Sequence, residues 1–150
     1  MRAKSGFTLV EILIVVVILG ILAAIVIPQF TDASSQAKES ALASDIQMMR
    51  SQLELYKIQH NDNLPDCTDQ ASFEACMLEQ TDQFGNPGTE CGPYMQKIPS
   101  NPFVTVDKAT LILFAASGTC PSNGEYGWWM RTDTGEFRAN DSYDPNHADY

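Results

Sequence analysis

The stretch GFTLVEILIVVVILGILAAIVIPQF, from Gly6 to Phe30, dominates this 150-residue sequence. From Phe7 onward it contains one charged side chain, that of Glu11. A helix rises about 1.5 Å per residue, so the run is long enough to cross a bilayer core of about 30 Å. A charge within hydrocarbon is costly and usually marks a function, so the position of Glu11 needs an explanation beyond anchoring.

Basic residues lie on only one side of the run. Arg2 and Lys4 precede it, and the next cation is Lys38. This asymmetry predicts a cytoplasmic N-terminus with the remaining chain on the other side of the membrane. A cleaved secretory signal is disfavoured, because its apolar region would be shorter and would end in a small-residue site before a polar start. An ordinary membrane anchor explains the length and the cations but not Glu11.

The residues Gly6-Phe7-Thr8-Leu9-Val10-Glu11 before an apolar helix resemble the N-terminal signal of type IV pilins and type II secretion pseudopilins. The shared features are a short basic leader, a glycine, an aromatic residue, and a glutamate four positions later. The resemblance implies that a prepilin peptidase cuts between Gly6 and Phe7 and methylates the new amine of Phe7. It also implies that Glu11 meets the Phe7 amine of a neighbouring subunit during assembly. A pair within one helix is the alternative, because the two residues are four positions apart.

The same resemblance extends to Pro28, which falls where these proteins carry a proline inside the helix. Proline removes one helical hydrogen bond, and Gly20 is a second weak position. The resemblance implies that the helix melts between Gly20 and Pro28 when subunits pack. The chain is then expected to contain a leader (1–6), a transmembrane or filament-core helix (7–30), an amphipathic helix (31–59) and a globular head (60–150).

Apolar residues recur with helical spacing after residue 40. They are Leu42, Ile46, Met49, Leu53 and Tyr56. Their steps of four and three place them on one face of a helix, which we expect to pack on a sheet. The predicted fold class is α+β: one long N-terminal helix, ending near Gln59, on a small antiparallel sheet of three or four strands, as in pilins.

The head contains recognisable local signals. Residues 69–80 are typical of a short helix capped by Thr68 or Asp69. Residues 110–116 are apolar and β-branched, which predicts a buried strand. Residues 126–131 and 136–139 predict a hairpin with Gly135 in a left-handed turn position. Trp128 and Trp129 are expected on opposite faces of a strand, with only one of them in the core.

Four cysteines lie beyond the apolar run. An even count in an oxidising compartment predicts two disulfides, and the lack of a CxxC pair makes a metal site less favoured. A helix over residues 69–80 would keep Cys67 and Cys76 too far apart to bridge. Two arrangements remain open: Cys67–Cys91 with Cys76–Cys120, or Cys67–Cys120 with Cys76–Cys91.

The loop GPYMQKIPSNPF resembles the loop before the strands in major pseudopilins, although Phe103 stands where tryptophan is frequent. The acidic end NDSYDPNHADY differs from the calcium loop of those proteins. Asp141, Asp144 and Asp149 still offer oxygen ligands to Ca²⁺, but their spacing fits no EF-hand and acidic tails are usually only solvated. No cofactor is therefore expected, with calcium at these three aspartates as the alternative.

Composition and motifs limit the function. The formal charge of −10 gives no electrostatic support for binding nucleic acid. No nucleophile elbow, HExxH or phosphate loop is present, so no enzyme is predicted. We expect a structural subunit of a pilus-like filament, most similar to the major pseudopilin of a type II secretion system. A type IV pilin for adhesion, motility or DNA uptake is the first alternative, and a membrane-tethered binding protein that does not polymerise is the second.

The same interpretation predicts where the protein works and with what. We expect a single pass through the inner membrane with a periplasmic head, followed by a periplasmic or cell-surface filament. The expected partners are further copies of the chain in a helical filament, a prepilin peptidase, the inner-membrane assembly platform, and minor pilins or pseudopilins.

Overall fold

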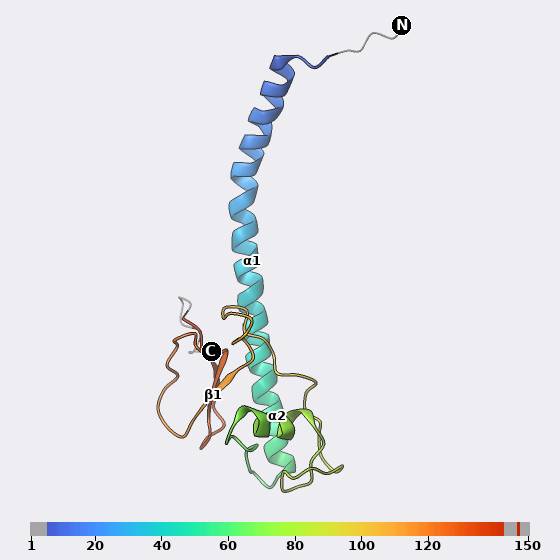
Figure 1. Cartoon of the computed structure of the whole chain (residues 1–150), viewed down its shortest axis with the longest axis vertical. Helices are drawn as coiled ribbons and strands as arrows, with labels where there is room; N and C mark the ends of the chain where they lie inside the picture. Colours follow the sequence, from blue (N-terminus) through green and yellow to red (C-terminus); the bar gives the residue numbers. More distant parts are fainter. Residues whose placement is uncertain (1–5, 143–146, 148–150) are drawn as a thin grey trace. The chain divides into compact units, whose positions relative to one another are not determined.

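The structure is a computed structural model that describes residues 6–142 and residue 147. Its elements are α1 (Leu9–Gln59), α2 (Gln70–Leu78), β1 (Ile112–Ala115), β2 (Trp128–Arg131) and β3 (Phe137–Ala139) (Figure 1). The chain divides into two units, residues 1–39 and 40–150, with the boundary inside α1. The fold is α+β with a long N-terminal helix, as the sequence predicted.

The second unit is built around the C-terminal part of α1. The five residues of the predicted stripe are the buried residues of this helix: Leu42, Ile46, Met49, Leu53 and Tyr56. The helix ends where the sequence indicated, because Asn61 and Asp62 adopt positive φ angles of 54° and 66°. The backbone N–H of Asp62 donates to the carbonyl of Lys57 at 2.8 Å, which closes the last turn.

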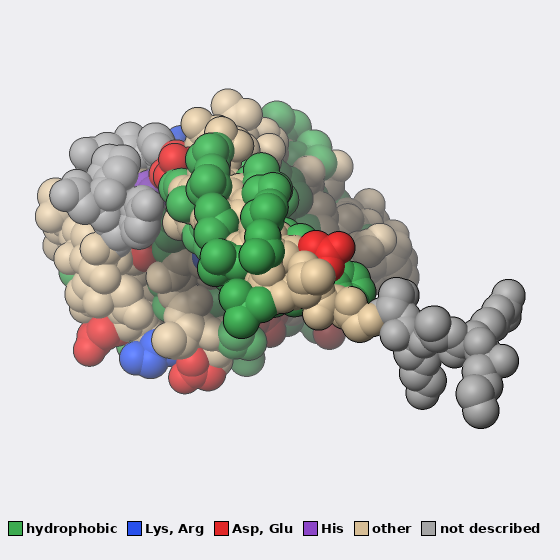
Figure 2. Space-filling view, turned by 90° about the horizontal axis from the view of Figure 1, so that it is seen from above, with side chains coloured by type: hydrophobic (Ala, Val, Ile, Leu, Met, Phe, Trp, Pro, Cys, Tyr) green, Lys and Arg blue, Asp and Glu red, His purple; other side chains and the backbone are tan. Residues whose placement is uncertain are grey.

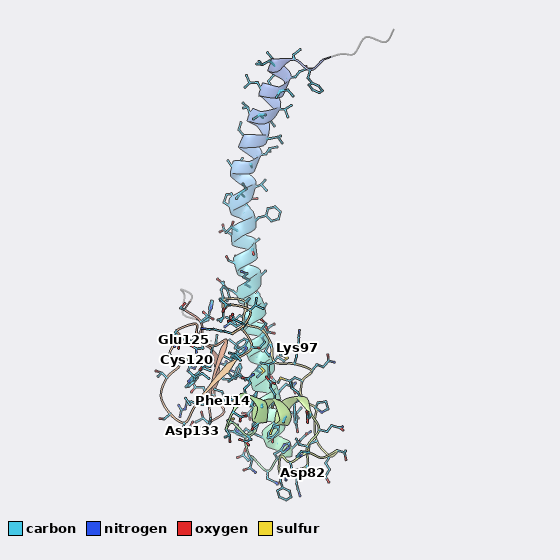
Figure 3. The ribbon with its side chains drawn as sticks, viewed as in Figure 1. Asp82, Lys97, Phe114, Cys120, Glu125 and Asp133 are labelled. Atoms are coloured by element: carbon cyan, nitrogen blue, oxygen red, sulfur yellow. The ribbon has the colours of Figure 1, made fainter. Side chains whose placement is uncertain are left out.

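The second helix, α2, packs beside this stripe. Asp69 is its N-cap, and its carboxylate accepts a hydrogen bond from the N–H of Ser72 at 2.8 Å. That bond lowers the pKa of Asp69. The helix buries Phe73, and the ring of Phe73 lies 5.5 Å from the ring of Phe114 in β1, which is labelled in front of α2 in Figure 3. The contact joins α2 to the sheet.

The sheet has three strands in the order β1-β2-β3 and is mixed, whereas an antiparallel sheet was predicted. β1 and β2 are parallel, with Ile112 opposite Trp128 and Ala115 opposite Arg131. β2 and β3 are antiparallel, as predicted for the hairpin. The reason lies in the connection: residues 116–127 are about as many as a parallel crossover needs, and they return the chain to the end at which β1 began.

The hairpin turn between β2 and β3 has the predicted chemistry. Gly135 has a φ of 76°, a value that favours glycine. Its N–H donates to the carbonyl of Arg131 at 2.9 Å, and the N–H of Arg131 donates to Glu136 at 2.9 Å. These bonds fix the register in which Trp128 faces Ala139.

Two predictions about burial were wrong in detail. In β1 only Ile112 is buried and the following three residues are half-buried, because β1 is an edge strand of the sheet. Trp129 is only 2% exposed, although one of the two tryptophans was expected at the surface. Trp128 joins the main core cluster and Trp129 does not, so both faces of β2 are covered.

Candidate functional site

The predicted cleavage bond lies in a non-helical segment just before α1. Gly6, Phe7 and Thr8 precede the first helical residue, Leu9, and all four are exposed. A peptidase needs its substrate backbone in an accessible, non-helical form, and the Gly6–Phe7 bond has it here. A methyl group built on the α-carbon of Gly6 meets no atom within 4 Å, so the chain itself does not require glycine there.

Glu11 closes the start of α1 through a reciprocal pair with Thr8. The N–H of Thr8 donates to Glu11 Oε2 at 2.9 Å, and the Thr8 hydroxyl donates to the same oxygen at 2.8 Å. The N–H of Glu11 lies 3.2 Å from Thr8 Oγ1. This is a capping box, in which the first residue and the third helical residue satisfy each other's backbone groups. The sequence analysis missed this role, although the pattern T-x-x-E before an apolar run is its usual signal.

The apolar run that follows is uncovered in the isolated chain. Its large hydrophobic side chains are all exposed, from Leu9 to Phe30. Figure 2, which looks along α1 from its N-terminal end, shows these side chains in rows at the surface. By length and composition α1 is the one helix, among the described residues, that is suited to cross a membrane, with a mean hydropathy of 3.3 in its most apolar window. An exposed apolar surface of this size requires lipid or other protein around it.

The two predicted weak positions lie inside α1 without interrupting it. Pro28 is an internal residue of the helix, and Gly20 has open space where a side chain would be. The hydroxyl of Thr31 donates to the carbonyl of Ile27 at 3.2 Å, beside the proline. The predicted melting between Gly20 and Pro28 is a property of assembled subunits and stays a prediction.

The four cysteines are thiols in this structure, and the two disulfides expected from the sequence stay a prediction. Cys120 donates to the carbonyl of Ala139 at 3.2 Å, in the connection between β1 and β2 where Figure 3 labels it. Cys76 is in different surroundings, hydrogen-bonded to Tyr56 within the core.

The separation of Cys67 from Cys76 that helix geometry predicts stays a prediction. Cys67 precedes Asp69, the N-cap of α2. Burial, with contributions from Asp66 and Cys76, raises the pKa of the Cys67 thiol to about 12.

One of the three calcium candidates lies in the described part of the chain. Asp141 is buried, and its carboxylate contacts Asn101 and His147 at 3.0 Å each. Asp144 and Asp149 lie outside the described residues. No sequence pattern connects Asn101 or His147 with Asp141, because their positions are 40 and 6 residues away and match no motif.

Comparison with known proteins supports the interpretation of the N-terminal segment. Residues 1–27 match the family model described as the prokaryotic N-terminal methylation motif. The chain is 40% identical over 105 residues to type II secretion system core protein G of Pseudomonas aeruginosa, covering 68% of this chain and 70% of that protein. The chain belongs to the type II secretion system core protein G family. The core protein G of Vibrio cholerae is 31% identical over 132 residues, covering 83% of this chain and 88% of that protein.

A pilin relative is similar over a smaller part of the chain. A fimbrial protein of Pseudomonas aeruginosa is 43% identical over 54 residues, covering 36% of this chain and 35% of that protein. No solved structure matches the chain significantly. Similarity to core protein G thus extends into the head, whereas similarity to the fimbrial protein covers about a third of each chain.

Proposed function

We propose that this chain is a structural, non-catalytic subunit of a pilus-like filament of a type II secretion system. The observation that carries the proposal is the exposed apolar part of α1 with one carboxylate at its start. Such a surface is stable in a bilayer and again in the centre of a bundle of identical helices, which gives it two successive environments. The type IV pilin alternative has less support, because the matching fimbrial protein covers only about a third of the chain.

Processing is the first step of the proposed function. The matched methylation motif and the accessible Gly6–Phe7 bond support cleavage there by a prepilin peptidase, followed by methylation of the new Phe7 amine. Loss of residues 1–6 removes Arg2 and Lys4, the two cations that favour a cytoplasmic N-terminus. The subunit then has a single-pass position in the inner membrane with its head in the periplasm.

Assembly is the second step, and the capping box defines how Glu11 takes part in it. Within the described residues, the hydrogen bonds to the Glu11 carboxylate end on Oε2. This keeps Oε1 available for the Phe7 amine of a neighbouring subunit, while Thr8 continues to hold the side chain in place. A carboxylate and an amine that enter an apolar core are tolerated only as a pair, so this contact sets the axial position of each new subunit.

The partners follow from these two steps. They are further copies of this chain, the prepilin peptidase, an inner-membrane assembly platform, and minor pseudopilins that share the N-terminal segment. The periplasmic filament would move secreted proteins outward. The acidic head gives no support for a nucleic-acid partner.

Substitution of Glu11 tests the proposal. Glu11→Ala and Glu11→Gln should leave membrane insertion, cleavage and protein level unchanged, and both should abolish or strongly reduce the filaments that electron microscopy shows in periplasmic extracts. Gln keeps the shape of the side chain and loses the charge that the incoming amine needs. Glu54→Gln is the matched control, because Glu54 is an exposed glutamate of the same helix.

Two outcomes would contradict the proposal. If Glu11→Ala forms filaments as well as the parent chain, the pairing between subunits is wrong. If the parent chain forms no filaments and the variant keeps full secretion activity, the tethered binding protein is the better interpretation.

A further inference from the structure

A buried polar cluster lies at the end of β3, apart from the N-terminal segment. Its members are Asn101, Asn140, Asp141 and His147, each at most 1% exposed. Asn101 lies 40 residues before Asp141, and His147 follows Asp141 by 6 residues. Buried polar groups cost free energy unless they are hydrogen-bonded, so a cluster of four needs a structural reason.

The carboxylate of Asp141 is the centre of this cluster. Its Oδ1 is 3.0 Å from His147 Nδ1, and its Oδ2 accepts a hydrogen bond from Asn101 Nδ2 at 3.0 Å. An ionised carboxylate only accepts hydrogen bonds, so His147 presents its Nδ1–H to Asp141. The imidazole ring also packs on Phe103, with ring centroids 4.5 Å apart. His147 is thus held by a polar contact and by an aromatic contact.

The cluster joins His147 to the sheet. Asn101 Nδ2 also donates to the carbonyl of Gly127 at 2.8 Å, immediately before β2. The N–H of Asn140 donates to the same carbonyl at 3.1 Å, and Asn140 Oδ1 accepts from the N–H of Asn123 at 3.1 Å. The carboxylate of Asp141 therefore connects His147, through Asn101, to the start of β2.

These contacts do not suit Asp141 for calcium. Ca²⁺ takes six to eight oxygen ligands at about 2.3–2.6 Å. Here each oxygen of the Asp141 carboxylate faces a nitrogen donor, whose hydrogen points at the place that a cation would need. Among the described residues, no group of three or more His, Cys, Asp or Glu side chains is placed to hold a metal ion.

We propose that His147 is held by its contacts with Asp141 and Phe103, and that these contacts stabilise the head without a metal, in place of the crosslink that calcium would provide. The imidazole supplies the hydrogen-bond donor that a buried carboxylate requires, and its ring packs on Phe103. The contacts involve neither Phe7 nor Glu11, so their test does not depend on the proposed filament.

Thermal unfolding of the full chain in detergent micelles tests the proposal. The melting temperature of the parent chain should be the same with excess EGTA and with millimolar CaCl2, and calorimetric titration should show no calcium binding. His147→Ala should lower the melting temperature by roughly 8 °C or more, because it leaves a buried carboxylate without one of its donors. His147→Asn should recover part of this loss, since its amide N–H can take the place of Nδ1–H.

The double variant Asp144→Asn/Asp149→Asn is the control for a calcium site. It should leave the melting temperature unchanged in both solutions. If calcium raises the melting temperature of the parent chain and the double variant abolishes that rise, the segment is a calcium site and the proposal is wrong. The proposal is also wrong if His147→Ala has the same melting temperature as the parent chain. If His147→Ala fails to fold, the His147→Asn variant and the calcium titration of the parent chain still decide between the proposal and a calcium site.

Discussion

Thr8 and Glu11 give one carboxylate two uses at different stages. In the monomer, Glu11 closes the first turn of α1 with Thr8, and in the proposed filament it receives the amine of a neighbour. The first contact prepares the second, because a side chain that is already ordered loses less conformational entropy when a partner arrives. A helix-capping residue therefore belongs to the proposed assembly site.

We expect Thr8→Val to weaken the start of α1. The change keeps the side-chain shape and removes the hydroxyl that contacts Glu11, at a cost of about 1 kcal/mol in local helix stability. Hydrogen exchange in micelles should then be faster for the amides of the first turn. Thr31→Val is the control, since the Thr31 hydroxyl contacts the carbonyl of Ile27 in the middle of α1. Equal protection in the Thr8 variant and the parent chain would show that the capping box is not formed in micelles.

Cys67 illustrates the chemistry of the half-buried thiols. Burial, together with Asp66 and Cys76, raises the pKa of Cys67 to about 12. Only the thiolate is nucleophilic, so alkylation of Cys67 in the native chain near pH 8 should be roughly a hundred- to a thousand-fold slower than that of an exposed cysteine. Mass spectrometry of the labelled peptide measures this rate.

Labelling in denaturant without reductant is the control for the Cys67 prediction. Unfolding restores the ordinary pKa, and the thiol should then react at the rate of a free cysteine. If Cys67 stays unlabelled in denaturant until a reductant is added, Cys67 forms a disulfide, as predicted from the sequence. It is then not a free thiol in the isolated protein.

At the level of elements, the mixed sheet depends on a close backbone contact at Gly127. A methyl group on this glycine would lie 2.0 Å from the carbonyl oxygen of Ala109. The N–H of Gly127 also donates to Lys108 at 2.9 Å, so the backbone of the segment before β1 lies directly against the segment before β2. This contact brings the two strands to the same end of the sheet and so permits their parallel pairing.

Gly127→Ala should therefore destabilise the head. The clash is with backbone, which cannot rotate away, and we expect a loss of about 1–3 kcal/mol in the free energy of unfolding. Thermal denaturation followed by tryptophan fluorescence reports the change through Trp128 and Trp129. Thr119→Ala, at an exposed position of the connection between β1 and β2, should unfold at the same temperature as the parent chain. A Gly127→Ala variant as stable as the parent would show that the two segments separate without cost.

At the level of the whole molecule, the features that were predicted are those that repeat or that obey local rules. The spacing of Leu42 to Tyr56 identified the buried face of α1, and Asp69 and Gly135 identified a cap and a turn. Parallel pairing of β1 and β2 was missed, because strand direction depends on a contact between segments that no local pattern records. The partners of His147 were missed for the same reason.

The division into two units leads to a prediction for a shortened chain. The buried apolar residues of the described chain begin at Leu42, and the large apolar side chains between Leu9 and Phe30 are exposed. A chain that starts at Ser34 should therefore fold without detergent, because it keeps the whole core and loses the surface that requires lipid or neighbouring helices. Its melting temperature should lie within a few degrees of that of the full chain in micelles, and it should elute as a monomer in gel filtration. It should also be absent from filaments, since it lacks Phe7 and Glu11.

Aggregation or a molten head in this variant would show that the N-terminal part of α1 stabilises the head, and the head would then have to be studied together with its membrane segment.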